Sequence, residues 1–128
     1  MIDSSVSVLV VDDMSTMRKV VMKACKELGF SNLSEAADGV AAWELISGAT
    51  VPYGLVISDW NMPNCSGLDL LKRLRKDSRL GSTPFVMVTA ETEKSQIAEA
   101  IAAGVSQYIL KPFKTETLRE KLAAIKPA

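Results

Sequence analysis

The chain alternates between short hydrophobic runs and longer stretches in which hydrophobic residues recur every three or four positions. One run, at 54–63, lies near the middle of the chain and ends in Asp59-Trp60-Asn61-Met62-Pro63. A continuous apolar run is typical of a central strand of a parallel sheet, because such a strand is buried on both faces. Pro63 ends the run, since proline lacks the N–H that a strand ladder needs. Asp59 is therefore predicted at the carboxyl end of a central strand, the edge where open α/β sheets bind ligands.

Other runs predict four more strands, at 6–11, 33–37, 85–89 and 107–110. The run at 33–37 is more polar, which favours a place near an edge of the sheet. Helical periodicity predicts helices at 15–28, 40–47, 66–76, 92–103 and 115–125. Ser15, Ser66 and Thr115 are predicted N-caps, and Gly29 and Gly104 are predicted helix ends. Five strands alternating with five helices predict one α/β domain over 1–128, with a parallel sheet covered by helices on both faces.

Polar residues stand at the ends of four of these strands: Asp12, Asp13, Asp59, Thr89 and Lys111. The carboxyl ends of parallel strands meet at one edge, so we expect these side chains to converge. Two carboxylates about 4 Å apart repel by about 1 kcal/mol in water and about 4 kcal/mol at an effective dielectric of 20, which favours a bound cation. Oxygen ligands in a short cluster with open positions suit Mg²⁺ best. A metal, a lysine and a hydroxyl around a carboxylate can stabilise phosphoryl charge, and a carboxylate can itself accept a phosphoryl group.

Each of these signals has an ordinary structural alternative. Asp12 and Asp13 can be a turn and helix cap, Thr89 a β-branched strand residue, and Lys111 a solvated charge. Tyr108 can be a packed residue with a wet hydroxyl. The basic residues of the third predicted helix, Lys72, Arg73, Arg75 and Lys76, are interpreted as a solvated face. The functional interpretation depends on the combination of residues at several strand ends.

Composition narrows the function classes. Lys plus Arg and Asp plus Glu both number 15 among 128 residues, so bulk charge favours neither nucleic acid nor an anionic membrane as a partner. The chain has no histidine, and its two cysteines lack CxxC spacing, which excludes a structural zinc site and a Cys/His catalytic pair. We expect two reduced thiols. The N-terminus lacks a basic signal-peptide start, and no run reaches the roughly 20 residues of a membrane helix, so a cytoplasmic, soluble protein is expected. The protein is also expected to be a monomer.

The motifs at 9–13, 37–39, 57–63, 88–91 and 111–113 resemble those of the receiver domains of two-component response regulators. The segments 15–18 and 58–64 resemble the chemotaxis branch of that family in particular. The match covers nearly the whole chain. It implies a flavodoxin-like, doubly wound sheet with strand order 2-1-3-4-5 and five helices, as a receiver domain without an output domain.

The resemblance also implies roles for the residues of the strand ends. Asp59 would accept a phosphoryl group from a phosphohistidine. Mg²⁺ would be held by Asp13, Asp59 and the backbone carbonyl of Asn61, with Asp12 acting through a metal-bound water. Further roles are implied for four residues: Lys111 pairs with Asp59, Thr89 and Tyr108 form the switch, and Glu91, together with Asn61, tunes hydrolysis. The Lys111–Pro112 bond is expected to be cis. The protein would not be an enzyme, although it would assist its own phosphorylation and dephosphorylation.

Partners are implied in the same way. A chemotaxis-type sensor histidine kinase would supply the phosphoryl group, and the flagellar motor switch protein would receive the signal. A phosphatase is a further candidate partner, with Lys94 as its basic contact. The implied partner surface lies on the fourth helix, fifth strand and fifth helix, at Thr92, Lys94, Ile97, Ile101, Val105, Tyr108, Leu110, Phe113 and Lys121.

Three alternatives to a motor-binding regulator stay open. A stand-alone receiver can act as a phosphorelay intermediate or phosphate sink, with the same active site. A haloacid dehalogenase-like phosphatase wants a second aspartate two positions after its nucleophile, where this chain has Met14 or Ser15. A flavodoxin wants a Ser/Thr/Gly-rich phosphate loop after the first strand, where this chain has Asp12 and Asp13.

Overall fold

Ten regular elements alternate along the chain in a computed structural model that describes residues 2–62, 65–90 and 94–125, without the side chain of Lys94. The strands are β1 (Val8–Val11), β2 (Leu33–Ala36), β3 (Leu55–Asp59), β4 (Phe85–Thr89) and β5 (Gln107–Leu110). The helices are α1 (Ser15–Glu27), α2 (Gly39–Gly48), α3 (Gly67–Lys76), α4 (Lys94–Ala102) and α5 (Thr115–Ala123). All strand pairs are parallel, and their order is β2-β1-β3-β4-β5. This confirms the predicted fold class, strand order and central position of β3.

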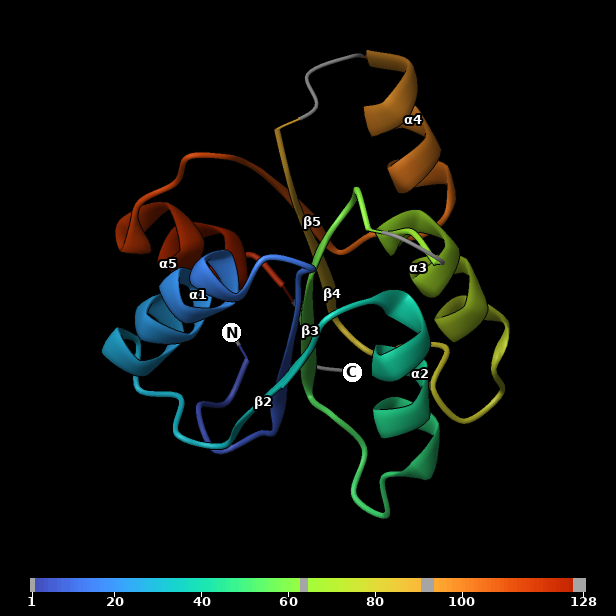
Figure 1. Ribbon diagram of the computed structural model, residues 1–128, viewed down its shortest axis with the longest axis horizontal. Helices are drawn as coiled ribbons and strands as arrows, with labels where there is room; N and C mark the ends of the chain where they lie inside the picture. Colours follow the sequence, from blue (N-terminus) through green and yellow to red (C-terminus); the bar gives the residue numbers. More distant parts are fainter. Residues whose placement is uncertain (1, 63–64, 91–93, 126–128) are drawn as a thin grey trace.

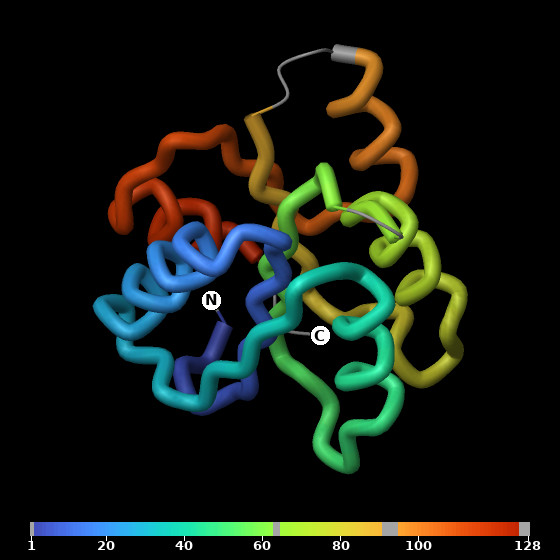
Figure 2. Tube along the Cα trace, in the orientation of Figure 1, coloured from blue at the N-terminus to red at the C-terminus, as the bar shows by residue number. Residues whose placement is uncertain are grey.

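The sheet separates two helical layers (Figure 1). Helices α1 and α5 cover one face, and α2, α3 and α4 cover the other, as the chain trace also shows (Figure 2). Alternate strand residues point to opposite faces, so Val8 and Val10 of β1 pack under α1 and α5, whereas Leu9 and Val11 pack toward α2 and α3. Strands β1, β3 and β4 are buried along their whole length. Burial on both faces explains why these strands lack polar alternation in the sequence.

Strand β2 is an edge strand, as its polarity predicted, and only Ala36 of its four residues is buried. Both cysteines are free, as expected, and burial raises the pKa of the Cys25 thiol to about 12. Among the residues that the structure describes, no helix combines the length and apolar character needed to cross a bilayer.

The helix ends agree only in part with the predicted capping residues. Ser66 caps α3 by accepting a hydrogen bond from the Asp69 N–H at 3.1 Å, as predicted. Ser15 and Thr115 are wrong as N-caps, because each is the first helical residue and the capping positions are Met14 and Lys114. Gly29 and Gly104 have φ values of 100° and 92° at the ends of α1 and α4, a region that glycine enters without strain.

The basic face of α3 is not simply solvated, which corrects the sequence interpretation. Arg75 is half-buried and donates hydrogen bonds to the carbonyl oxygens of Gly104 at 3.0 Å and Thr83 at 2.6 Å. Arg73 stacks on the ring of Trp43 in α2, with its guanidinium carbon 4.4 Å from the ring centroid. Lys72 and Lys76 are exposed, as expected. Two of the four cations therefore hold neighbouring elements together.

Gly67 is predicted to stabilise the close packing of α3 against the end of β3. A Cβ on Gly67 would overlap the carbonyl oxygen of Asp59 and lie 2.9 Å from Sδ of Met87. We expect Gly67→Ala to lower the free energy of unfolding by about 1–3 kcal/mol, because neither neighbour can move freely in a packed core. Urea unfolding measures the change.

Gly48 at the end of α2 is the matched control, since a Cβ there would meet nothing within 4 Å. Gly48→Ala should leave stability unchanged or raise it by up to about 1 kcal/mol, because alanine favours the helix. Equal unfolding midpoints for the two variants would contradict the close packing at Gly67.

Candidate functional site

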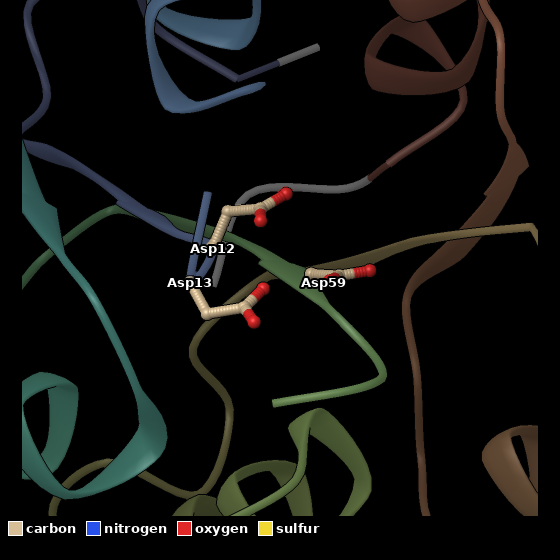
Figure 3. Close-up of side chains that lie close together, drawn as sticks. All are labelled: Asp12, Asp13 and Asp59. Carbon is tan, nitrogen blue, oxygen red and sulfur yellow. The ribbon is translucent and has the colours of Figure 1, made fainter. Parts of the chain in front are cut away.

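Three carboxylates meet at the carboxyl edge of the sheet, as the sequence predicted (Figure 3). Asp59 is the last residue of β3, and Asp12 and Asp13 directly follow β1. Strands β1 and β3 are neighbours, and Val11 lies opposite Ser58. The residues that follow these two, Asp12 and Asp59, therefore lie side by side. One carboxylate oxygen from each of the three residues lies within 4.8 Å of the others. Asp12 is 3% exposed and Asp59 9%, whereas Asp13 is exposed.

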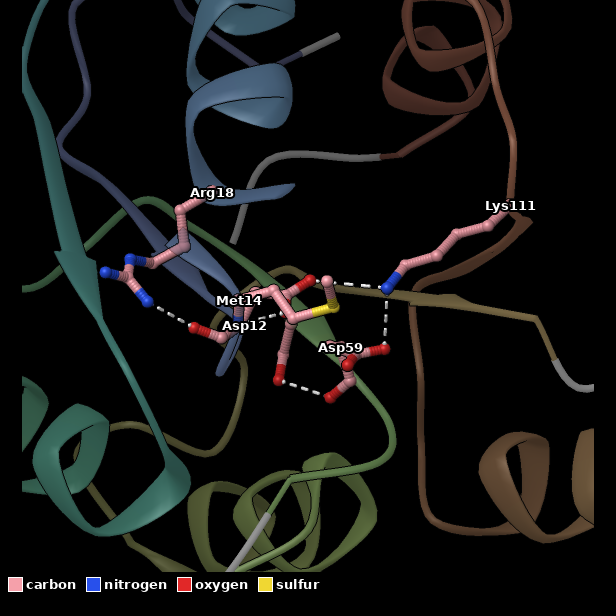
Figure 4. Close-up of polar contacts among 6 residues, drawn as sticks. Asp12, Met14, Arg18, Asp59 and Lys111 are labelled. Carbon is pink, nitrogen blue, oxygen red and sulfur yellow. Dashed lines mark hydrogen bonds and ion pairs between the residues drawn. The ribbon is translucent and has the colours of Figure 1, made fainter. Parts of the chain in front are cut away.

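Lys111 joins two of these carboxylates. Its Nζ donates to Asp59 Oδ1 at 3.1 Å and to Asp12 Oδ2 at 3.3 Å (Figure 4). The residue directly follows β5, and its N–H donates to the Thr89 carbonyl oxygen at 2.8 Å, which continues the ladder between β4 and β5. The Lys111–Pro112 peptide bond is cis, as expected. Lys111 is therefore an ion-pair partner of the acidic cluster and not a solvated charge.

Burial and the neighbouring charge of Lys111 have opposite effects on the pKa of Asp59. Burial raises the pKa of Asp59, the hydrogen bond from Lys111 lowers it, and the charge of Asp12 raises it again, leaving the pKa above its ordinary value. Burial alone would lower the pKa of Lys111, but the hydrogen bonds and charges of Asp59 and Asp12 outweigh it and raise this pKa. One ammonium group faces three carboxylates, so the ionised site carries excess negative charge. The excess attracts a cation to the position beside Asp59.

The backbone and the side chain of Asp12 are both held in place. Its Oδ1 accepts from the Met14 N–H at 2.9 Å, and its carbonyl oxygen accepts from Nη1 of Arg18 at 2.8 Å. Arg18 also forms a 2.6 Å ion pair through Nε with Glu35 on β2. The sequence interpretation missed Arg18 and Glu35 as site residues. A signal was present, because Arg18 lies in the first turn of the helix that follows the acidic pair and can reach back to it.

Three further predicted residues, Thr89, Tyr108 and Asn61, lie on β4, on β5 and just after β3. Thr89 is fully buried at the end of β4, next to β3 in the sheet. Tyr108 on β5 is half-buried, with its ring edge-on to Trp60 at 6.5 Å between centroids. Asn61 is exposed two residues after Asp59. The predicted tuning residue Glu91 and the surface residue Thr92 lie outside the described residues.

The predicted partner surface contains two large hydrophobic side chains open to solvent. Ile101 on α4 is 65% exposed and Leu110 on β5 is 44% exposed. Ile97, Val105, Phe113 and Lys121 are of intermediate exposure. Lys94 begins α4, but its side chain is outside the described residues. The predicted surface therefore has exposed apolar side chains on both α4 and β5, as a protein-docking surface often has.

The geometry of the acidic cluster fits a small divalent cation with oxygen ligands. Opposite oxygens of an octahedral Mg²⁺ lie about 4.2 Å apart, since each Mg–O bond is about 2.1 Å. Oxygens within 4.8 Å of one another can reach such an ion through a small closure or a water molecule. Three carboxylates are few for Ca²⁺, which takes 6–8 oxygen ligands. Asp13, Asp59 and, more indirectly, Asp12 are the residues that can hold a metal.

This strand order, with an aspartate cluster and a lysine at the carboxyl edge of the sheet, defines a receiver-type signalling domain. The family model described as "Response regulator receiver domain" matches residues 8–123. The chain belongs to this family, and it is a chemotaxis-type receiver of the two-component class.

Curated relatives and a solved structure support the same assignment. The chain is 44% identical over 124 residues to "Chemotaxis protein CheY-3" of Vibrio cholerae, which covers 97% of this chain and 94% of that protein. It is 44% identical over 117 residues to "Chemotaxis protein CheY1" of Helicobacter pylori, covering 91% and 94% of the two chains. The structure of V. cholerae chemotaxis protein CheY4 matches with a TM-score of 0.85 at 33% identity, over 95% of this chain and 99% of that one.

The raised pKa of Asp59 predicts a pH-dependent gain in stability from Asp59→Asn. A group whose pKa is raised by folding stabilises the folded state below its unfolded pKa, and this contribution is lost as the pH rises through the folded pKa. At pH 7 and without divalent cations, Asp59→Asn should therefore raise the free energy of unfolding. The gain should shrink as the pH falls toward 3.8.

Chemical unfolding in EDTA across this pH range measures the effect. Glu44→Gln removes one exposed carboxylate from α2, which carries none of the cluster residues, and should change stability by a few tenths of a kcal/mol at most. A destabilised Asp59→Asn protein at neutral pH would contradict the repulsion inferred for the site.

Proposed function

We propose that the protein is a phosphoryl acceptor of chemotaxis signalling, with Asp59 as the phosphorylated residue. The observation that carries this proposal is the 3.1 Å contact of Lys111 with Asp59 inside a cluster of three carboxylates. The carboxylate of Asp59 lies at the carboxyl edge of the sheet, and Lys111 compensates part of its charge. A carboxylate oxygen of Asp59 attacks the phosphorus of a phosphohistidine, the P–N bond breaks, and an acyl phosphate forms.

Asp13, Asp59 and the Asn61 carbonyl would hold Mg²⁺, which would supply positive charge against the phosphoryl oxygens. Asp12 would bind the ion less directly than Asp13 and Asp59. Lys111 already contacts one oxygen of Asp59 and can follow the charge onto the phosphoryl group. Thr89 offers its hydroxyl from the neighbouring strand β4. Each residue thus stabilises charge at a fixed place, which is how phosphoryl transfer is chiefly accelerated.

The signal ends when water attacks the phosphorus and the P–O bond to Asp59 breaks. Asn61 and Glu91 are the residues that tune this hydrolysis. The protein assists both steps on its own side chain, so it is a signalling switch and not an enzyme acting on a separate substrate. We place it in the cytoplasm, where a chemotaxis-type sensor histidine kinase supplies the phosphoryl group.

The output is a shift between two conformations of α4, β5 and α5. The phosphoryl group favours one conformation only to the extent that it interacts more strongly with it. Thr89 turns toward the phosphoryl oxygens, and Tyr108 moves further inward from its place beside Trp60. The surface around Ile101 and Leu110 then binds the flagellar motor switch protein. A phosphatase is a further partner, contacting Lys94 at the start of α4.

Intact mass spectrometry tests the acceptor chemistry. Incubation with a small phosphodonor such as acetyl phosphate should add one phosphoryl group in Mg²⁺ and none in EDTA. Asp59→Asn should abolish the adduct, since Asp59 ends the central strand β3 and its carboxylate makes the closer of the two contacts with Lys111, at 3.1 Å against 3.3 Å for Asp12. Asp69→Asn, which removes an exposed carboxylate on α3, is the control and should be phosphorylated normally. An adduct that persists in Asp59→Asn would assign the acceptor elsewhere.

Binding to the motor switch protein separates a motor regulator from a relay or phosphate sink. A peptide from the switch protein should bind the phosphorylated chain at least about tenfold more tightly than the unphosphorylated one, a coupling of about 1.4 kcal/mol. Ile101→Ser should weaken binding and leave phosphorylation intact, because the side chain is 65% exposed on α4, whereas the acidic residues end β3 and follow β1. Equal binding in both states would favour the relay or sink alternative.

A further inference from the structure

Among the described residues, the Asp13 carboxylate, unlike that of Asp12, is not oriented by a contact of its own side chain. In the part of the chain that the structure describes, Asp13 is exposed, and no hydrogen bond or ion pair holds its side chain. By contrast, the carboxylate of Asp12 is held by the Met14 N–H and by Lys111. The direction of the Asp13 side chain therefore depends on the backbone that carries it.

That backbone is fixed on both sides of Asp12. The Asp12 N–H donates to the Ala36 carbonyl oxygen at 3.1 Å, which extends the β1–β2 ladder by one residue. The Asp12 carbonyl oxygen accepts from Nη1 of Arg18 at 2.8 Å. A peptide group is planar, so holding this carbonyl also sets the amide nitrogen and Cα of Asp13.

Arg18 is itself held from a second direction. Its Nε lies 2.6 Å from Oε1 of Glu35, and its side chain is only 16% exposed. Figure 4 shows Arg18 and Lys111 on opposite sides of Asp12. The planar guanidinium fork donates at once to a carboxylate on β2 and to the carbonyl at the end of β1, which a lysine ammonium cannot do with the same fixed geometry. The contact joins α1, β1 and β2 at the rim of the acidic cluster.

We propose that Arg18, anchored by Glu35, is a positioning residue for the metal site: it holds the Asp12–Asp13 peptide so that the Asp13 carboxylate faces Asp59. The inference rests on the proposed Mg²⁺ binding by Asp13 and Asp59. Arg18 does not touch the metal or the phosphoryl group, and it acts through the backbone of Asp12. Partners that orient metal ligands commonly contribute tenfold or more to metal affinity.

Charge and geometry predict opposite effects of removing Arg18. A guanidinium beside a cation site repels the cation, so on charge alone Arg18→Met should tighten Mg²⁺ binding. If Arg18 instead positions the metal site, the same change frees the Asp12–Asp13 peptide. Mg²⁺ binding should then weaken, by about 3- to 10-fold for a site with one exposed ligand. The sign of the change therefore distinguishes the two accounts.

A Mg²⁺ titration without any phosphodonor measures this change. The fluorescence of Trp60, which follows Asp59 directly, reports binding in a Trp43→Phe background, where it is the sole tryptophan. Arg18→Met should have the weaker affinity. The double variant Arg18→Met/Glu35→Gln removes both charges and should show the same loss, whereas a charge effect would cancel. Lys19→Met removes a positive charge from the next, exposed residue of α1 and should leave the affinity unchanged or slightly tighter.

Two further measurements separate positioning from a general structural defect. Phosphorylation of Arg18→Met by acetyl phosphate should be slow at low Mg²⁺ and approach the wild-type rate at saturating Mg²⁺. A defect in the fold would slow it at every concentration. Arg18→Lys keeps the charge and can make one of the two contacts, so it should fold even where Arg18→Met does not, with an intermediate loss of Mg²⁺ affinity.

Unaltered or tighter Mg²⁺ binding by Arg18→Met, beside a normal wild-type titration, would overturn the positioning role and leave the proposed function in place. A return to wild-type affinity in the double variant would also overturn it, because the contact with the Asp12 carbonyl oxygen is missing there as well. A wild-type protein that binds no Mg²⁺ would overturn the proposed function and this inference together.

Discussion

Electrostatic repulsion among three carboxylates at one sheet edge is the constraint on which the site depends. Asp12 and Asp59 are almost completely buried, so water screens them poorly, and Lys111 compensates only part of their charge. The folded chain thus holds an unfavourable charge arrangement that a cation and a phosphoryl group can relieve in turn. Sensitivity to both ligands follows from the same arrangement, since each ligand changes the charge that its neighbours experience.

The fold maintains this arrangement through backbone contacts around the acidic residues. Asp12 lies beside Asp59 because β1 and β3 are neighbours in the sheet, and the ladder between β4 and β5 places Lys111 at the same edge. Gly67 lets α3 begin against the Asp59 carbonyl, and the Gly67 N–H donates to the Trp60 carbonyl oxygen at 2.9 Å. The loop after β3 is thereby tied to the helix that follows it. The side chains of Ile101 on α4 and Leu110 on β5 are exposed at the surface, where a change of conformation costs less.

The sequence predicted the parts of the molecule that depend on local pattern. The buried runs placed β1, β3 and β4, and parallel topology then brought Asp12, Asp13, Asp59 and Lys111 to one edge. The sequence did not predict contacts that depend on the exact packing of distant segments. Arg75 looked like one more solvated cation, but the carbonyl group of Gly104, 29 residues away, accepts its hydrogen bond. The ion pair of Arg18 with Glu35 spans 17 residues and was missed for the same reason. Ser15 had the right residue type for a cap, but the helix begins at Ser15 itself.

A crystal structure with Mg²⁺ and beryllium trifluoride, a mimic of the phosphoryl group, tests whether Asp59 is the phosphoryl acceptor. We expect the beryllium on an oxygen of Asp59, the Mg²⁺ among Asp13, Asp59 and the Asn61 carbonyl, and Lys111 in contact with a fluorine. Asp12 should stay where the Met14 N–H and Arg18 hold it. Beryllium trifluoride bound away from Asp59, or a metal that contacts neither Asp13 nor Asp59, would contradict the roles proposed for these residues.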